Sequence, residues 1–224
     1  MRRVHYYSGW FDGALPKQLA ESLRNDITDK KSIVIVWGAW AIDEYVRYAK
    51  DWFDGAGIVF DEYHGIDTRM DKTAAHDVIR NASVILLMGR NTIPQKDFMA
   101  EYELAAPIKE SKATIIMGTS AGAKNMAKKF VCAIDCNYEA EERAVYDGLA
   151  LDSFSHEPYF SLDKTGLIQN YLLPLSQEID IYATGNDAAI RSENGKVTVV
   201  MGDVYLISGS NVQKMENYKE HLYD

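Results

Sequence analysis

Short apolar runs alternate with segments of helical periodicity through the first half of the chain. The run Ser83 to Met88 (SVILLM) has no polar alternation, which is typical of a strand buried on both faces. The segment Asp43 to Phe53 instead repeats apolar residues at helical spacing, which indicates an amphipathic helix. The same patterns predict strands over 4–7, 32–36, 58–60 and 113–117, and helices over 15–25, 73–80 and 95–109, the last broken near its end by Pro107.

The connections between these strands are too long for hairpins, so we expect a parallel sheet with helices on both faces. The second half of the chain predicts an aromatic-rich loop over 149–160, a helix over 164–175, and short strands over 179–183, 188–191, 197–201 and 204–208. Asn194-Gly195 is a strong hairpin signal, which favours antiparallel strands at one edge of the sheet. The pattern therefore predicts one α/β domain over 1–224, a three-layer sandwich with a mainly parallel central sheet.

One stretch of this pattern carries candidate chemistry. Lys112 to Phe130 reads as a strand, then Gly118-Thr119-Ser120-Ala121-Gly122, then a helix, which is the context of a nucleophile elbow. Such a turn lifts the Ser120 hydroxyl clear of the sheet and leaves the Ala121 amide free to stabilise negative charge. The turn after the SVILLM strand, 89–92, is expected at the same edge, where parallel sheets bind ligands. A glycine-rich turn that only packs closely would explain the same glycines.

Composition limits the partners and the compartment. The 224 residues carry a net charge of −9, which argues against nucleic acid or an anionic membrane as the main partner. The two cysteines, Cys132 and Cys136, have no second pair to complete a zinc site and are expected to be thiols in a reducing cytosol. Neither a signal peptide nor a membrane span is recognisable. We expect a cytoplasmic protein without metal or cofactor.

A serine nucleophile needs a base within hydrogen-bond reach, and the chain has five histidines. His156 is the candidate base because it follows the elbow in the predicted aromatic loop, from which an imidazole can reach the sheet edge. The competing interpretation is a solvent-exposed histidine beside the turn at Pro158. From the residues alone, this second interpretation is favoured.

The elbow G-T-S-A-G-A, the turn Gly89-Arg90-Asn91-Thr92 and the segment Gly148-Leu149 before His156 resemble the peptidase E group. These serine dipeptidases are related to cyanophycinase and have a fold similar to class I glutamine amidotransferases. The resemblance implies that Ser120 is the nucleophile and His156 the general base. It further implies an oxyanion hole formed by the amides of Ala121, Gly89 and Arg90. Substrate contacts are implied for Asn91 and Thr92.

The chain departs from this family at two positions. The family turn is usually G-G-N-T, whereas Arg90 replaces the second glycine here. The family also places an acidic residue before a later strand to orient the histidine, and an ungapped match puts Asn186 there, with Asp187 next. Only one of these neighbours can point to the histidine, and Glu157 is a third choice.

The resulting hypothesis is a serine peptidase that hydrolyses small peptides through an acyl-enzyme, as a monomer or homodimer. A dipeptidase selective for an acidic N-terminal residue is the narrower form of it. The alternative is a catalytically weak or inactive homologue that binds a small molecule or peptide. A glutaminase of the amidotransferase type is disfavoured because those enzymes carry cysteine at the elbow.

Overall fold

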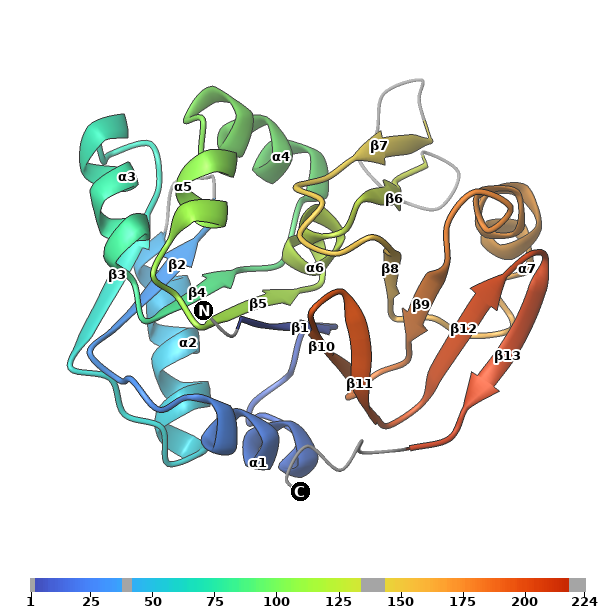
Figure 1. The fold of residues 1–224 in the computed structure, drawn as a ribbon, viewed down its shortest axis with the longest axis horizontal. Helices are drawn as coiled ribbons and strands as arrows, with labels where there is room; N and C mark the ends of the chain where they lie inside the picture. Colours follow the sequence, from blue (N-terminus) through green and yellow to red (C-terminus); the bar gives the residue numbers. More distant parts are fainter. Residues whose placement is uncertain (1–2, 38–41, 134–143, 218–224) are drawn as a thin grey trace.

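A seven-stranded sheet organises this computed structural model, which describes residues 3–37, 42–133 and 144–217 (Figure 1). Its strand order is β11-β10-β1-β5-β4-β2-β3. The strands from β1 to β3 in that order are parallel, and β10 and β11 add an antiparallel edge. The bounds are β1 (Val4–Ser8), β2 (Ser32–Val36), β3 (Glu62–Ile66), β4 (Val84–Leu87), β5 (Ile115–Thr119), β10 (Ala189–Glu193) and β11 (Lys196–Met201).

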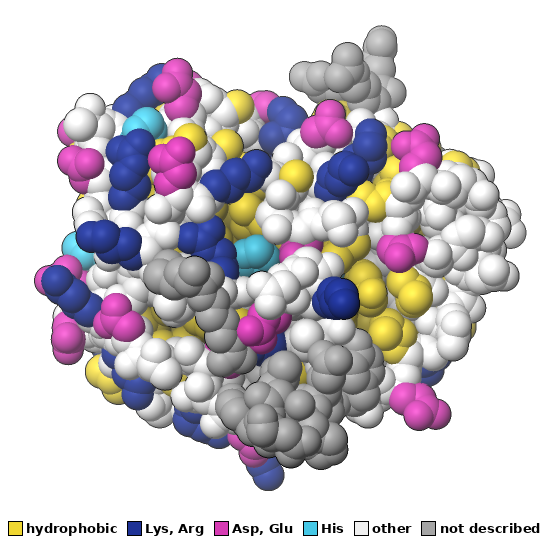
Figure 2. All heavy atoms as spheres, in the orientation of Figure 1, with side chains coloured by type: hydrophobic (Ala, Val, Ile, Leu, Met, Phe, Trp, Pro, Cys, Tyr) yellow, Lys and Arg dark blue, Asp and Glu magenta, His cyan; other side chains and the backbone are white. Residues whose placement is uncertain are grey.

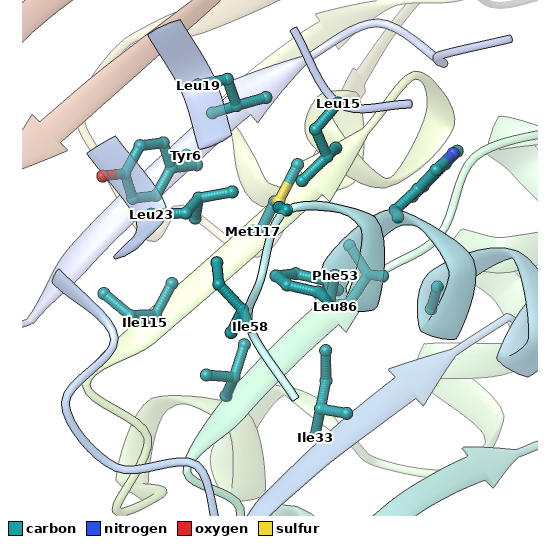
Figure 3. Packing of buried hydrophobic residues seen from close by; sticks show 14 of the residues in the cluster. Tyr6, Leu15, Leu19, Leu23, Ile33, Phe53, Ile58, Leu86, Ile115 and Met117 are labelled. Atoms are coloured by element: carbon teal, nitrogen blue, oxygen red, sulfur yellow. The ribbon is translucent and has the colours of Figure 1, made fainter. Parts of the chain in front are cut away.

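Helices cover both faces of this sheet. Successive residues of a strand point to opposite faces, so each strand contributes side chains to two separate cores. Ile33 and Ile35 of β2 belong to the core under α1 and α2, part of which is drawn in Figure 3. Val34 and Val36 belong to the core under the other four helices. The helices are α1 (Lys17–Asp26), α2 (Ile42–Gly55), α3 (Lys72–Asn81), α4 (Thr92–Glu101), α5 (Ala105–Glu110) and α6 (Ala121–Met126). The expected three-layer α/β fold is confirmed.

A second sheet lies beside the first, with strand order β13-β12-β9-β8 (Figure 1). A helical segment packs on it through Leu172, which is fully buried. The strands are β8 (Ser155–Pro158), β9 (Ile181–Thr184), β12 (Val204–Ser208) and β13 (Asn211–Met215), and a separate hairpin pairs β6 (Lys129–Val131) with β7 (Val145–Asp147). The helical segment consists of α7 (Thr165–Leu167), the π-helical turn η2 (Ile168–Leu172) and α8 (Leu173–Leu175).

Several elements differ from the sequence prediction. Ile58 and Phe60 are buried and Val59 is exposed, but residues 58–60 form no strand, and the pairing with β2 begins only at Glu62. The predicted helix 95–109 is two helices, separated where Glu103 takes a φ of 54°. Pro107 does not break a helix, because it lies in the first turn of α5, where its missing N–H removes no hydrogen bond.

The later strands are also distributed differently. The hairpin at Asn194-Gly195 joins β10 to β11 at the edge of the main sheet, as expected. However, β9 and β12 belong to the second sheet, and 155–158 is a strand rather than part of a loop. Cys132 is buried, and Cys136 lies outside the described residues.

The surface in the view of Figure 2 carries charges of both signs, interspersed over the helices α3, α4 and α5. Among the described residues, no helix is both long enough and apolar enough to cross a membrane.

Candidate active site

Ser120 sits in a strained turn between β5 and α6. Its φ of 51° and ψ of −113° lie outside the regions that most non-glycine residues occupy. The neighbouring strand β1 holds this conformation, since the Ser120 amide donates to the Ser8 carbonyl at 2.8 Å. A half-buried serine held in this way has the backbone geometry of a nucleophile elbow.

The glycines of the motif allow α6 to pack directly on the sheet. A Cβ on Gly122 would lie 1.9 Å from the Leu87 carbonyl oxygen, and one on Gly118 would lie 2.6 Å from Cα of Ala123. Close packing and the elbow are therefore one arrangement rather than competing explanations of the glycines.

Ser120 opens into a cavity of about 300 Å³. Its walls are mainly aromatic, and Glu44 and Arg90 add one charge of each sign. The Nη1 of Arg90 donates to the Tyr45 hydroxyl at 3.3 Å. The aromatic residues are Trp10, Tyr45, Tyr48 and Tyr159.

Tyr159 lines the same cavity as Ser120. Its hydroxyl accepts the Trp10 amide N–H at 2.7 Å. Burial raises the pKa of Tyr159, the interactions with the Ser120 side chain and the Trp10 amide lower it in part, and the charge of Asp12 raises it further. The phenol is therefore neutral at pH 7.

His156 lies elsewhere, fully buried on β8. Its Nε2 is 3.2 Å from Oγ1 of Thr184, and its Nδ1 has no hydrogen-bond partner among the described residues. Burial, and then the charge of Lys124, lower the pKa of His156 to about 3. The expected base is thus on a paired strand rather than in a loop, and it is not among the residues that line the cavity at Ser120.

The candidates for the third triad member are not at the histidine either. Asn186 and Asp187 occupy the exposed turn between β9 and β10, where Asp187 has a φ of 56°. Glu157 forms a buried ion pair with Lys124 at 2.9 Å. The side chain within hydrogen-bond distance of the His156 ring is that of Thr184, for which the sequence offered no signal.

The three residues expected to donate amides to an oxyanion differ in their surroundings. Gly89 approaches the elbow closely, and a Cβ there would lie 2.6 Å from Cβ of Ser120. Its amide, however, donates to Oγ1 of Thr119 at 3.0 Å. Arg90 lines the cavity, and Ala121 is the first residue of α6, directly after Ser120.

The two expected substrate contacts lie at the start of α4 and are not among the cavity-lining residues. Asn91 precedes the first turn of that helix. Thr92 is buried, and its carbonyl accepts the Asn125 side-chain amide at 3.0 Å.

Sequence reasoning missed the aromatic walls of the cavity. Two of them had a usable signal: Trp10 follows the carboxyl end of β1, and Tyr159 follows the carboxyl end of β8, positions at which strands present ligand-binding residues. Tyr45 and Tyr48 come from α2, where their spacing is that of ordinary helix packing. In the part of the chain that the structure describes, no group of His, Cys, Asp or Glu is placed to hold a metal ion.

The model of peptidase family S51 matches residues 12–200. A peptidase from an acI-B1 Actinobacterium is 14% identical, with a TM-score of 0.67 over 98% of this chain and 97% of that chain. A putative peptidase E protein from Listeria monocytogenes EGD-e is 16% identical, with a TM-score of 0.66 over 96% of this chain and 100% of that chain.

These two structures share the fold of the chain. No curated protein matches it. Since the family model spans most of the sequence, the chain belongs to peptidase family S51 and is a serine-type peptidase.

Proposed function

We propose that the chain hydrolyses short peptides, with Ser120 as the nucleophile and an acyl-enzyme as the intermediate. The observation that carries this proposal is the strained Ser120, held at the mouth of a cavity of about 300 Å³. A volume at the small end of ligand pockets suits a dipeptide or a short peptide end better than a folded protein. Hydrolysis of dipeptides is the narrower form of the proposal.

The amides of Ala121 and Arg90 are the proposed oxyanion donors, because the Gly89 amide already donates to Oγ1 of Thr119. The Arg90 guanidinium is proposed to bind the carboxylate of the substrate. Arg90 lines the cavity, whereas the buried cations Lys124 and Arg191 are not among the residues that line it.

Selectivity for an acidic N-terminal residue is a separate proposal that rests on the family resemblance. The aromatic lining instead favours an apolar side chain in the same cavity. Comparing hydrolysis of Asp-Leu and Phe-Leu by kcat/KM decides between them, and a higher value for Phe-Leu would reject acidic selectivity. Cytoplasmic location and a monomeric or dimeric state stay predictions from the sequence.

A second candidate function is peptide binding with little turnover. It is favoured by one observation: the titratable side chains that line the cavity with Ser120 include Tyr159, whose pKa is raised, and no histidine. A neutral phenol is a weaker base than an imidazole at pH 7.

Labelling with a fluorophosphonate probe tests the nucleophile directly. The intact protein is expected to label, Ser120→Ala to lose labelling completely, and Ser153→Ala, a change at an exposed serine outside the cavity, to label as the intact protein does. Absence of labelling in the intact protein would reject Ser120 as a working nucleophile and leave the binding function. Isothermal titration with a non-hydrolysable dipeptide would then measure that binding.

A further inference from the structure

We propose that Tyr159, and not a histidine, is the proton partner of Ser120. The inference rests on the proposed role of Ser120 as nucleophile and names the residue that exchanges a proton with it. Its first support is position, because Tyr159 and Ser120 line the same cavity and the Ser120 side chain acts on the pKa of the phenol.

The second support is the way the chain holds the phenol in place. The Trp10 amide donates to the Tyr159 oxygen at 2.7 Å, which orients the hydroxyl and stabilises its ionised form. The ring also lies against the chain at Gly9, where an added Cβ would be 3.0 Å from Cε1 of Tyr159. Backbone from the end of β1 therefore fixes both the ring and its oxygen.

The third support is local strain. Tyr159 has a φ of 57°, a left-handed conformation that is unfavourable for a bulky aromatic residue. Strained residues cluster at functional sites, where the surrounding structure compensates for them. Ser120 has the same kind of strain, with a φ of 51°, so both members of the pair are held in unfavourable conformations facing one cavity.

His156 does not compete for the role in this arrangement. Its Nε2 lies beside Thr184, and its ring packs on Tyr7 with centroids 5.5 Å apart. The His156 side chain is fully buried, and it is not among the residues that line the cavity at Ser120.

The chemical step balances with these two side chains and water. The ionised Tyr159 oxygen takes the Ser120 proton while Oγ bonds to the peptide carbonyl carbon and the carbonyl π pair moves to oxygen. When this intermediate collapses, the C–N bond breaks and the amine leaves with the proton from Tyr159. Water then attacks the ester, gives its proton to Tyr159, and releases the acid as Ser120 recovers a proton from Tyr159.

The pH dependence follows from the charges around the phenol. Asp12 raises the pKa of Tyr159 together with burial, so the ionised form is scarce at pH 7 and increases toward alkaline pH. A rate that needs this form rises about tenfold per pH unit below that pKa. The charged groups in the two cavities that Tyr159 borders are Glu44, Arg90, Asp163, Lys164 and Asp203.

The first test is the pH profile of fluorophosphonate labelling. The intact protein is expected to label faster with each pH unit from 6 to 9, and Tyr159→Phe to label about 100-fold more slowly at pH 8. Tyr63→Phe is the matched control, since it removes a tyrosine hydroxyl that bonds to Asp54 on the far edge of the sheet. Unchanged labelling of Tyr159→Phe, with loss in His156→Asn, would overturn the proposal in favour of the histidine.

The second test does not need turnover. The ring-carbon NMR signal of Tyr159, assigned by its absence in Tyr159→Phe, reports the ionisation of the phenol. Because the Ser120 side chain lowers the pKa of Tyr159, Ser120→Ala is expected to raise that pKa further. An unshifted titration would overturn the pairing even if Ser120 labels. A shifted titration in a protein that does not label would support the pairing and reject the proposed hydrolysis.

Discussion

At the residue scale, the charge of Arg90 distinguishes this cavity from a purely aromatic one. The guanidinium bonds to the Tyr45 hydroxyl, which directs it along the cavity wall. A carboxylate that enters the cavity would meet it as a charge-assisted donor.

Arg90→Met is therefore expected to raise KM about tenfold for dipeptides with a free carboxylate and to change kcat little. Steady-state kinetics with the same dipeptides as C-terminal amides provides the control, since an amide has no charge for Arg90 to bind. An equal loss on both substrate sets would mean that Arg90 shapes the cavity rather than binds the carboxylate.

His156 carries a second residue-scale consequence. Its pKa of about 3 in the folded protein is below the value of 6.5 for an unperturbed histidine, so the unfolded chain binds more protons between these pH values. Stability contributed by the neutral ring is therefore complete above pH 6.5 and decreases as the pH falls.

Between pH 6.5 and 5, this histidine is expected to remove about 2 kcal/mol from the free energy of unfolding. Urea denaturation across that range measures the slope, and His156→Asn is expected to flatten it. A variant that keeps the slope of the intact protein would show that other groups cause the acid sensitivity.

At the element scale, α6 joins the two sheets. It packs on β4 through Gly122 and connects to β8 through the ion pair of Lys124 and Glu157, whose side chains are each 1% exposed. The elbow is thus held both by close backbone packing and by a buried charge pair.

Gly122→Ala tests the packing contact. The new methyl group would clash with the Leu87 carbonyl, so the free energy of unfolding is expected to fall by about 1–3 kcal/mol. Gly166→Ala is the matched control, because nothing lies within 4 Å of its Cβ position in α7 and the change is expected to be neutral or slightly stabilising. Equal denaturation midpoints for the two variants would contradict the close packing of α6.

The ion pair makes a different prediction. Lys124→Met is expected to cost about 3–5 kcal/mol, because it takes away the opposite charge beside buried Glu157. Adding Glu157→Met is expected to recover much of that loss, and chemical denaturation of both variants measures the difference. A double variant as unstable as the single one would show that the pair acts through packing alone.

At the scale of the whole molecule, the sequence predicted the parallel half of the fold better than the rest. Runs such as Ser83 to Met88 are continuously apolar, and this pattern alone predicts a strand that is buried on both faces. The strand β8 reads Ser155-His156-Glu157-Pro158, and no hydrophobic pattern marks it, although all four residues are buried.

The site shows the same limit. Ser120 was recognisable because its strain requires a local motif of small residues. Tyr159 was not, because its proposed role depends on its contact with Trp10 and on a cavity shared with Ser120, and both residues are distant in the sequence. The expectation that His156 is the base followed from residue chemistry, without knowledge of the strand on which that ring is buried.

The main sheet also has a bearing on synthesis. Its strand β1 lies between β5, which precedes Ser120, and β10, which starts at Ala189. Tyr159 follows β8, whose pairing partner β9 ends only at Thr184. Most of the chain must therefore leave the ribosome before Ser120 and Tyr159 can line the same cavity. If the proposed pairing is the catalytic one, the nascent chain is expected to stay inactive beside other nascent proteins until its own fold is nearly complete.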